Sequence, residues 1–174
     1  MHSFFFRLTL GLYCFLPTAS RAQFVSATLG ISGLTCSMCS YAVQTELERL
    51  PFVEKTSLDL NTNIALIKFK ADQKVDMRQV VNAVYKAGFS VAYTEADFVF
   101  NQIALSDLFS FSYDGFKYQF LKPTPLLLNG KTTLKFIDKK YLRKKDYNFW
   151  SPMIKERLKG TPKTDADVLY HVTL

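Results

Sequence analysis

The stretch from Phe24 to Cys39, FVSATLGISGLTCSMC, decides the fold of the first half of the chain. Phe24 to Ser32 alternate between apolar and small or polar side chains, which predicts a β-strand. Gly33 to Ser40 follow as a loop that carries two cysteines. Tyr41 to Leu50 then place apolar residues at helical spacing, and a proline closes the segment, so a helix is predicted there.

The next elements follow at short spacing. Val53 to Leu60 and Ile64 to Lys70 are predicted strands, joined by the turn Asn61 to Asn63. Asp76 is expected to cap a helix that runs through Ala87, with Gly88 ending it. Phe89 to Tyr93 supply a last strand. The order β-α-β-β-α-β is the ferredoxin-like arrangement, so residues 23–97 are interpreted as one α+β domain.

Residues 98–174 have a different pattern and are interpreted as a small β-rich domain of no family that we can assign. Tyr113 to Phe116 and Leu128 to Lys131 each contain Asp-Gly or Asn-Gly between apolar runs, which predicts two hairpin turns. A helix is predicted from Asp146 to Leu158, on the condition that Pro152 falls in its first turn or breaks it. Val168 to Leu174 is predicted to be a strand.

The first 22 residues have the features of a secretory signal peptide. The apolar run Leu8 to Leu16 is about half the roughly 20 residues that a membrane-spanning helix needs. Ser20 and Ala22 fit the small-x-small cleavage rule, so Gln23 would begin the mature chain. We therefore expect an exported protein, periplasmic or extracellular, with no transmembrane segment after cleavage.

Composition and charge are those of a globular protein. The chain has 174 residues, 22 Lys and Arg, 15 Asp and Glu, and a formal net charge of +7. Removing residues 1–22 takes away two arginines and no acids, which leaves +5. The excess belongs to residues 98–174, with 13 basic and 7 acidic residues, whereas residues 23–97 have 7 and 8. A localised positive charge favours an acidic partner or an anionic surface, and export argues against nucleic acid.

The two remaining cysteines carry the clearest functional signal. Cys36 and Cys39 lie three positions apart between a predicted strand and a predicted helix. A helix N-terminus favours thiolate over thiol, and paired thiolates select soft ions: copper(I) first, with mercury(II) or zinc(II) also possible. A structural zinc site usually needs four ligands, and no second cysteine pair follows. His171 is distant in sequence and is interpreted as a packed or exposed strand residue.

Residues 26–95 resemble the heavy-metal-associated domain of copper chaperones, copper-pumping ATPases and the periplasmic mercury-binding protein. The family motif G-M-T-C-x-x-C appears here as GLTCSMC, with Leu34 in place of methionine as an apolar residue beneath the loop. The sequence Lys86 to Phe89 matches the family's Ala-Gly-aromatic start of the last strand. The resemblance implies that Cys36 and Cys39 bind the metal and that Thr35, Leu34 and Phe89 support them.

Other interpretations of the cysteine pair stay open at this point. In an oxidising compartment the pair could form a permanent disulfide, or it could exchange thiols and disulfides as in thioredoxin-like proteins. The β-α-β-β-α-β order argues against a thioredoxin-like fold. Met38 is expected to be exposed, with a thioether role as a minor alternative.

Two functional hypotheses follow. The first is a non-enzymatic, exported metal carrier that receives copper(I) from, or passes it to, a donor or acceptor protein such as another heavy-metal-associated domain or a membrane copper transporter. The second is a scaffold protein whose cysteines form a disulfide and whose basic second half binds a partner. In both, a basic strip is the candidate docking surface, unless it is only a solvated face. Its members are Lys139, Lys140, Arg143, Lys144 and Lys145.

Overall fold

The computed structural model describes residues 22–106, 109–122, 124–159 and 168–174. The expected signal peptide, residues 1–22, lies outside these ranges except for its last residue. The elements, in chain order, are β1 (Gln23–Ser32), α1 (Ser37–Glu48), β2 (Val53–Asp59), β3 (Ile64–Phe69), α2 (Met77–Lys86), β4 (Ser90–Ala104), β5 (Ser110–Tyr113), β6 (Phe116–Phe120), β7 (Leu127–Phe136), α3 (Lys144–Leu158) and β8 (Val168–Thr173).

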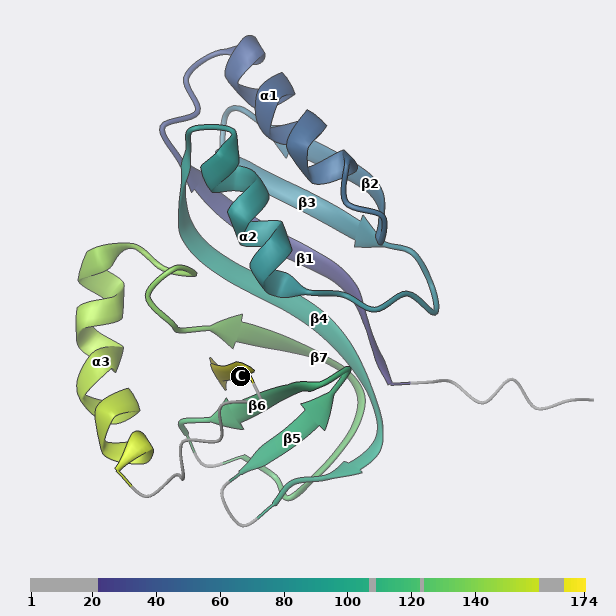
Figure 1. Ribbon diagram of the computed structural model, residues 1–174, viewed down its shortest axis with the longest axis vertical. Coiled ribbons are helices and arrows are strands. Elements are labelled where there is room, and N and C mark those ends of the chain that lie inside the picture. The colour runs from purple at the N-terminus through teal and green to yellow at the C-terminus, as the bar shows by residue number, and fades with distance from the viewer. Residues whose placement is uncertain (1–21, 107–108, 123, 160–167) are drawn as a thin grey trace, which may run out of the picture.

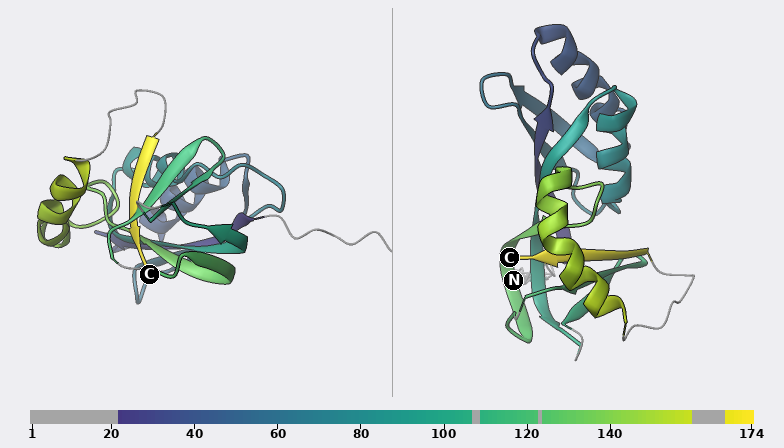
Figure 2. Two further views of the ribbon diagram at one scale, coloured as in Figure 1. Left: turned by 90° about the horizontal axis from the view of Figure 1, so that it is seen from below. Right: turned by 90° about the vertical axis from the view of Figure 1, so that its left-hand side faces the viewer.

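The first half is a ferredoxin-like unit, as the sequence predicted. Its strands lie in the order β2-β3-β1-β4, and every neighbouring pair is antiparallel. Helices α1 and α2 lie side by side on one face of these strands (Figures 1 and 2). The other face carries exposed side chains, among them Lys55, Ser57, Leu66 and Lys68, so the two helices cover a one-sided core.

The second half continues the same sheet. The order across all eight strands is β2-β3-β1-β4-β7-β8-β6-β5. Strand β4 bonds with β1 on one side and with β7 on the other, and Asp97 pairs with both Ser26 and Thr133 in this ladder. The boundary expected near residue 97 therefore lies within β4, where the two halves share backbone hydrogen bonds. The division into two domains, residues 23–97 and 98–174, stays a prediction.

Helix α2 forms where its capping residues predicted it. Asp76 is the N-cap, and its carboxylate accepts a hydrogen bond of 2.9 Å from the backbone N–H of Arg78. Gly88, with a φ of +90°, turns the chain after the last helical residue. The buried face of α2 consists of Met77, Val80, Val81, Ala83 and Val84. The cap and the terminating glycine lie where they were predicted, so local sequence was enough to place this helix.

An aromatic core joins the two halves. Phe24 on β1 is 1% exposed and packs edge-on against Phe98, with ring centroids 4.8 Å apart. Phe98 on β4 also meets Phe111 and Tyr113 on β5, at centroid distances of 5.4 and 4.9 Å. Strands β4 and β5 are separated by three others in the sheet order. The second half of the sheet must therefore curl back over itself, as Figure 2 shows.

One of the two predicted hairpins is correct and the other is wrong. Asp114 and Gly115 have φ of +51° and +80° and connect β5 to β6 in a two-residue turn. Asn129 and Gly130, by contrast, lie inside β7. Gly130 has a φ of +79° beside the point where the β4–β7 register shifts. Gly130 therefore allows a local irregularity within a long strand. An Asn-Gly pair in the sequence is compatible with either such an irregularity or a turn.

Helix α3 begins at Lys144 and continues through Pro152, contrary to the expectation that proline would lie in the first turn or break the helix. Proline has no N–H to donate to the carbonyl four residues earlier, on Asn148. The hydroxyl of Ser151 donates to that carbonyl oxygen at 3.4 Å. This side-chain bond partly satisfies the group that proline leaves free.

Candidate metal centre

Both cysteines lie at the start of α1. Cys36 is the N-cap residue, with extended backbone angles, and its Sγ accepts a hydrogen bond of 3.3 Å from the N–H of Cys39. Its carbonyl oxygen accepts the N–H of Ser40 at 3.2 Å, which closes the first helical turn. The helix thus begins earlier than the expected Tyr41, and Cys39 belongs to its first turn. Both cysteines are free thiols in the structure.

The surroundings of Cys36 favour its thiolate. The pKa of Cys36 is lowered, first by a hydrogen bond from the Cys39 side chain and then by the backbone N–H groups of Cys39 and Met38. These donors belong to the open N-terminus of α1, where the partial positive charge of the helix stabilises an anion. Cys36 is exposed and Cys39 half-buried, so one thiol is directly accessible to a reaction partner.

The residues expected to support the cysteines fall into two groups. Leu34 is 4% exposed and belongs to the core, as its position in the motif implied. Phe89 packs beside the loop, because a side-chain carbon on Gly33 would lie 3.9 Å from its ring. Gly33 itself has a φ of +90°, which L-residues rarely adopt. Thr35 is exposed, and the structure gives it no contact that bears on the thiols.

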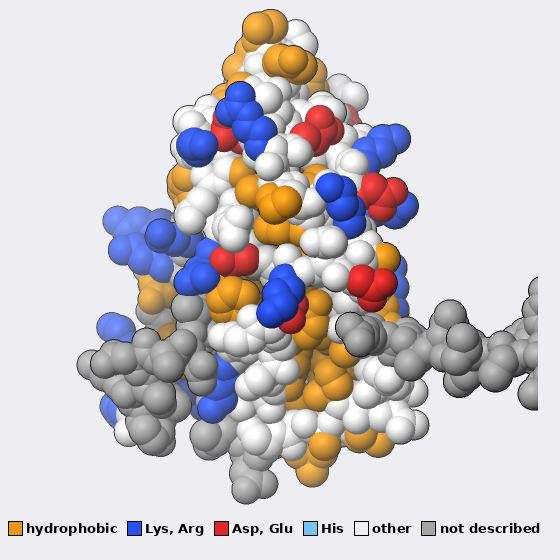
Figure 3. All heavy atoms as spheres, turned by 45° about the vertical axis from the view of Figure 1, so that its right-hand side comes forward, with side chains coloured by type: hydrophobic (Ala, Val, Ile, Leu, Met, Phe, Trp, Pro, Cys, Tyr) orange, Lys and Arg blue, Asp and Glu red, His pale blue; other side chains and the backbone are white. Residues whose placement is uncertain are grey.

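The cysteine loop lies at one tip of the molecule, where α1 begins (Figure 1). Met38 and Tyr41 are 73% and 67% exposed there. Figure 3 shows hydrophobic side chains at this tip, with acidic and basic groups intermixed below it. Within the described ranges no third Cys, His, Asp or Glu joins the pair to form a metal-binding cluster. The site therefore offers two sulfur ligands and an open approach from solvent.

The basic strip lies elsewhere, between β7 and the first turn of α3. All five members of the strip are exposed: Lys139, Lys140, Arg143, Lys144 and Lys145. Arg143 bonds with Asp146 at 3.0 Å, and its N–H donates to the carbonyl of Ala92 on β4. The structure does not bring this strip to the cysteine loop (Figure 1). A partner would have to contact two separate regions.

The structure also reveals a pair that sequence analysis missed. His171 is 4% exposed, and its Nδ1 lies 2.7 Å from the carboxylate of Asp138. The sequence favoured a packed or exposed strand histidine over a metal ligand at this position. The two residues are 33 positions apart, and only the antiparallel pairing of β7 with β8 brings them together. The one signal in the sequence was a lone histidine beside apolar strand positions.

Comparison with known proteins confirms the resemblance for the first half. Residues 28–90 match the family model of the heavy-metal-associated domain. Over 82 residues the chain is 26% identical to a probable copper-exporting P-type ATPase from Archaeoglobus fulgidus. This match covers 47% of the chain but 10% of that protein, so the chain spans about a tenth of its relative's length.

Several solved structures are also similar. Oxidized MerP from Ralstonia metallidurans CH34 is 30% identical, with 41% of this chain and 97% of that chain covered and a TM-score of 0.35. The yeast copper transporter domain CCC2A, solved in apo and Cu(I)-loaded states, is 28% identical, with 37% and 88% covered and a TM-score of 0.35. A CopZ metallochaperone is 24% identical, with 38% and 98% covered and a TM-score of 0.37.

Among the described residues, no helix combines the length and the hydrophobicity needed to cross a bilayer.

Proposed function

We propose that this protein is an exported carrier of soft metal ions, most of all copper(I), and that Cys36 and Cys39 hold the ion. One observation carries the proposal: the Sγ of Cys36 caps α1 by accepting the N–H of Cys39, so both thiols belong to one exposed helix start. The match of residues 28–90 to the heavy-metal-associated domain supports it. Mercury(II) and zinc(II) are the alternative cargoes.

The chemistry of the pair suits a monovalent soft ion. Two thiolate ligands suffice for near-linear copper(I), and sulfur prefers it to hard cations. The ion displaces the thiol protons, and the N–H groups at the start of α1 offset the negative charge that remains. Hydrogen bonding already lowers the pKa of Cys36, which favours the thiolate that binds the ion.

Transfer requires that the ion never be released into solution. The exposed position of Cys36 lets a partner thiolate attack the under-coordinated ion. One new S–Cu bond gives a three-coordinate intermediate, and the bond to Cys36 or Cys39 then breaks. Copper stays in the +1 state throughout, and the departing thiolate takes up a proton. The protein acts as a carrier, and no catalytic group is required.

The partner is proposed to be a metal donor or acceptor, such as another heavy-metal-associated domain or a membrane copper transporter. The similarity over 82 residues to a probable copper-exporting P-type ATPase from Archaeoglobus fulgidus supports a transporter as partner. Lys144 and Lys145 are exposed at the start of α3 and offer positive charge for docking to an acidic surface. Export, if it occurs, places this exchange in the periplasm or outside the cell.

The decisive experiment is an anaerobic titration of copper(I) into the reduced chain from Gln23 to Leu174, against a competing chromogenic chelator. We expect one equivalent to bind tightly and the binding to be lost in Cys36→Ser and in Cys39→Ser. Ser37→Ala is the matched control, since it changes the same turn and removes no thiol. A copper affinity in both cysteine variants equal to that of the wild type would contradict the proposal. A disulfide between Cys36 and Cys39 that resists mild reductant would also contradict it.

A further inference from the structure

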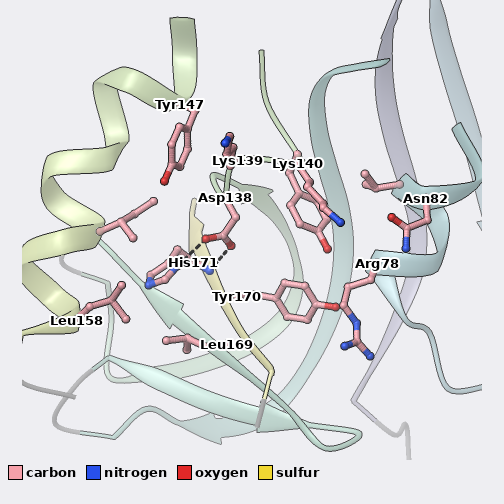
Figure 4. Close-up of a pocket in the computed structure, with 13 residues that line it drawn as sticks. Arg78, Asn82, Asp138, Lys139, Lys140, Tyr147, Leu158, Leu169, Tyr170 and His171 are labelled. Atoms are coloured by element: carbon pink, nitrogen blue, oxygen red, sulfur yellow. Dashed lines mark hydrogen bonds and ion pairs between the residues drawn. The ribbon is translucent and has the colours of Figure 1, made fainter. Parts of the chain in front are cut away.

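A second candidate site lies in the other half of the molecule. A pocket of about 430 Å³ opens between α2, the segment after β7, α3 and β8. Figure 4 shows Arg78 and Asn82 on the α2 side, Tyr147 and Leu158 on the α3 side, and His171 between them. This volume lies within the range of small-molecule sites. The pocket contains neither cysteine, so it is separate from the proposed metal centre.

The walls of the pocket are mainly hydrophobic. Val81 from α2, Ile154 and Leu158 from α3 and Leu169 from β8 all line it. Leu158 is 45% exposed although it faces the other apolar side chains. An apolar group that entered the pocket would remove this surface from water, which is the main source of affinity for small ligands.

One of the lining residues, His171, carries a buried polar atom without a partner in the described part of the chain. The Asp138 carboxylate accepts the backbone N–H of His171 at 2.8 Å and contacts its Nδ1 at 2.7 Å. The opposite ring nitrogen, Nε2, is buried and has no hydrogen-bond partner among the described residues. Leaving such an atom unpaired costs free energy. A carboxylate that fixes one imidazole nitrogen orients the other for a ligand.

The charges around the pocket favour an anion. Lys139 and Lys140 line it and are exposed. Arg78 lines it from α2, although its guanidinium already pairs with Asp76 at 3.0 Å. Among the described residues that line the pocket, Asp138 carries the one carboxylate, and both of its oxygens contact His171. Within this described lining, a ligand with a negative group would meet cations and no free carboxylate.

We propose that this pocket binds a small amphipathic carboxylic acid. Its hydrocarbon body lies along Val81, Ile154 and Leu158, and its carboxyl group reaches His171 Nε2. A hydrogen bond between the carboxyl group and Nε2 satisfies the unpaired nitrogen, with the proton on either partner. Lys139 and Lys140 stabilise the negative charge at the rim. Nothing in this proposal depends on copper binding by the cysteines.

The test uses octanoate as the probe and 1-octanol as its neutral counterpart. The chain from Gln23 to Leu174 contains every described element and only one histidine, His171. Its imidazole signals in proton NMR therefore report on the pocket without assignment. We expect octanoate to shift them in a saturable way, with a Kd of about 0.01–1 mM. Octanol should bind at least about fivefold more weakly, because it lacks the charge.

Matched lysine variants separate a local contact from overall charge. Lys139→Gln/Lys140→Gln removes two charges from the pocket lining, and Lys144→Gln/Lys145→Gln removes two from residues outside it. We expect the first variant to bind octanoate about three- to tenfold more weakly and the second to change affinity less than about twofold. Circular dichroism checks that the lysine variants keep the fold of the wild type. Unchanged octanoate affinity in the Cys36→Ser protein checks that the cysteines do not contribute to octanoate binding.

Three results would overturn the proposal. One is the absence of any shift in the His171 signals at millimolar octanoate, and another is equal binding of octanoate and octanol. The third is an equal loss of affinity in the two double-lysine variants, because that would make the attraction a property of net charge. Loss of copper binding in Cys36→Ser with octanoate binding intact would leave this proposal standing and bear only on the metal centre.

Discussion

The hydroxyl of Tyr170 on β8 lies 3.2 Å from the carboxylate of Asp76, to which it donates a hydrogen bond, and Asp76 is the N-cap of α2. The two residues are 94 positions apart. Asp76 also accepts the backbone N–H of Arg78 at 2.9 Å and its guanidinium at 3.0 Å. The last strand of the chain thus stabilises the start of a helix in the first half, which couples the basic half to the ferredoxin-like half.

Removal of the Tyr170 hydroxyl tests this coupling. We expect Tyr170→Phe to lower the free energy of unfolding by about 0.5–1.5 kcal/mol, the usual value of one hydrogen bond. Urea denaturation followed by circular dichroism measures the change. Tyr41→Phe serves as the control, because Tyr41 is 67% exposed, and should change stability by less than about 0.5 kcal/mol. A free energy of unfolding in Tyr170→Phe equal to that of the wild type would show that this hydrogen bond does not contribute to stability.

The same carboxylate should make stability depend on pH. The pKa of Asp76 is lowered in the folded protein: burial opposes ionisation, but the hydrogen bonds and charge of Arg78 and the hydroxyl of Tyr170 outweigh it. The unfolded chain therefore binds the proton more readily than the folded one. The stabilisation is fully present above the ordinary aspartate pKa of about 3.9 and is lost as pH falls below it.

The comparison of wild type with Asp76→Asn isolates this effect from that of other acids. Urea midpoints measured between neutral pH and about pH 3 should fall less steeply in Asp76→Asn than in the wild type. Asp97→Asn is a useful second variant, since the pKa of Asp97 is also lowered in the folded protein. Parallel midpoint curves for the wild type and Asp76→Asn would contradict the assignment.

Gly30 and Tyr93 should be energetically coupled across the β1–β4 ladder. They are paired in register, and a Cβ on Gly30 would lie 2.2 Å from the Tyr93 ring. We expect Gly30→Ala to lower the free energy of unfolding by about 1–3 kcal/mol through overpacking. In a Tyr93→Ala background the same change should cost close to nothing. Additive effects in this double-mutant cycle would mean that the ring does not occupy that space.

Charge at the start of α3 should influence transfer but not affinity. We expect Lys144→Gln/Lys145→Gln to keep the copper(I) affinity of the wild type, because neither residue contacts the cysteine loop. Transfer to an acidic acceptor protein should slow by about two- to tenfold at low ionic strength and converge with the wild type in high salt. Stopped-flow measurement of copper exchange tests this. A weakened copper affinity in this variant would contradict the separation of binding from docking.

Local sequence was sufficient to predict much of the first half. The alternation in β1, the cap at Asp76 and the glycine at position 88 are all short-range signals, and β1, β2, β3 and α2 lie within a few residues of their predicted bounds. Strand β4 was predicted to end at Tyr93, but it continues to Ala104. The cysteine motif was equally local, since two residues three positions apart at a helix start need no distant contact to come together. That is why sequence could indicate this candidate site.

The structure of the second half depends on contacts between residues far apart in the sequence, which short-range patterns do not predict. The Asn129-Gly130 pair resembled a turn, but β4 extends past residue 97 and holds it within a strand. Helix α3 passes through Pro152, which short-range signals alone had placed in the first turn or at a break.

The sequence by itself determined the ferredoxin-like order and the paired thiols, because hydrophobic period, caps and motif spacing act within a few residues. Only the tertiary structure decided that both halves share one sheet and that Tyr170 reaches Asp76. It also decided that Asp138 holds His171 beside a pocket. Strand pairing and side-chain packing between distant residues set these features. The free energy of such contacts depends on residues that are neighbours in the fold but far apart in the sequence.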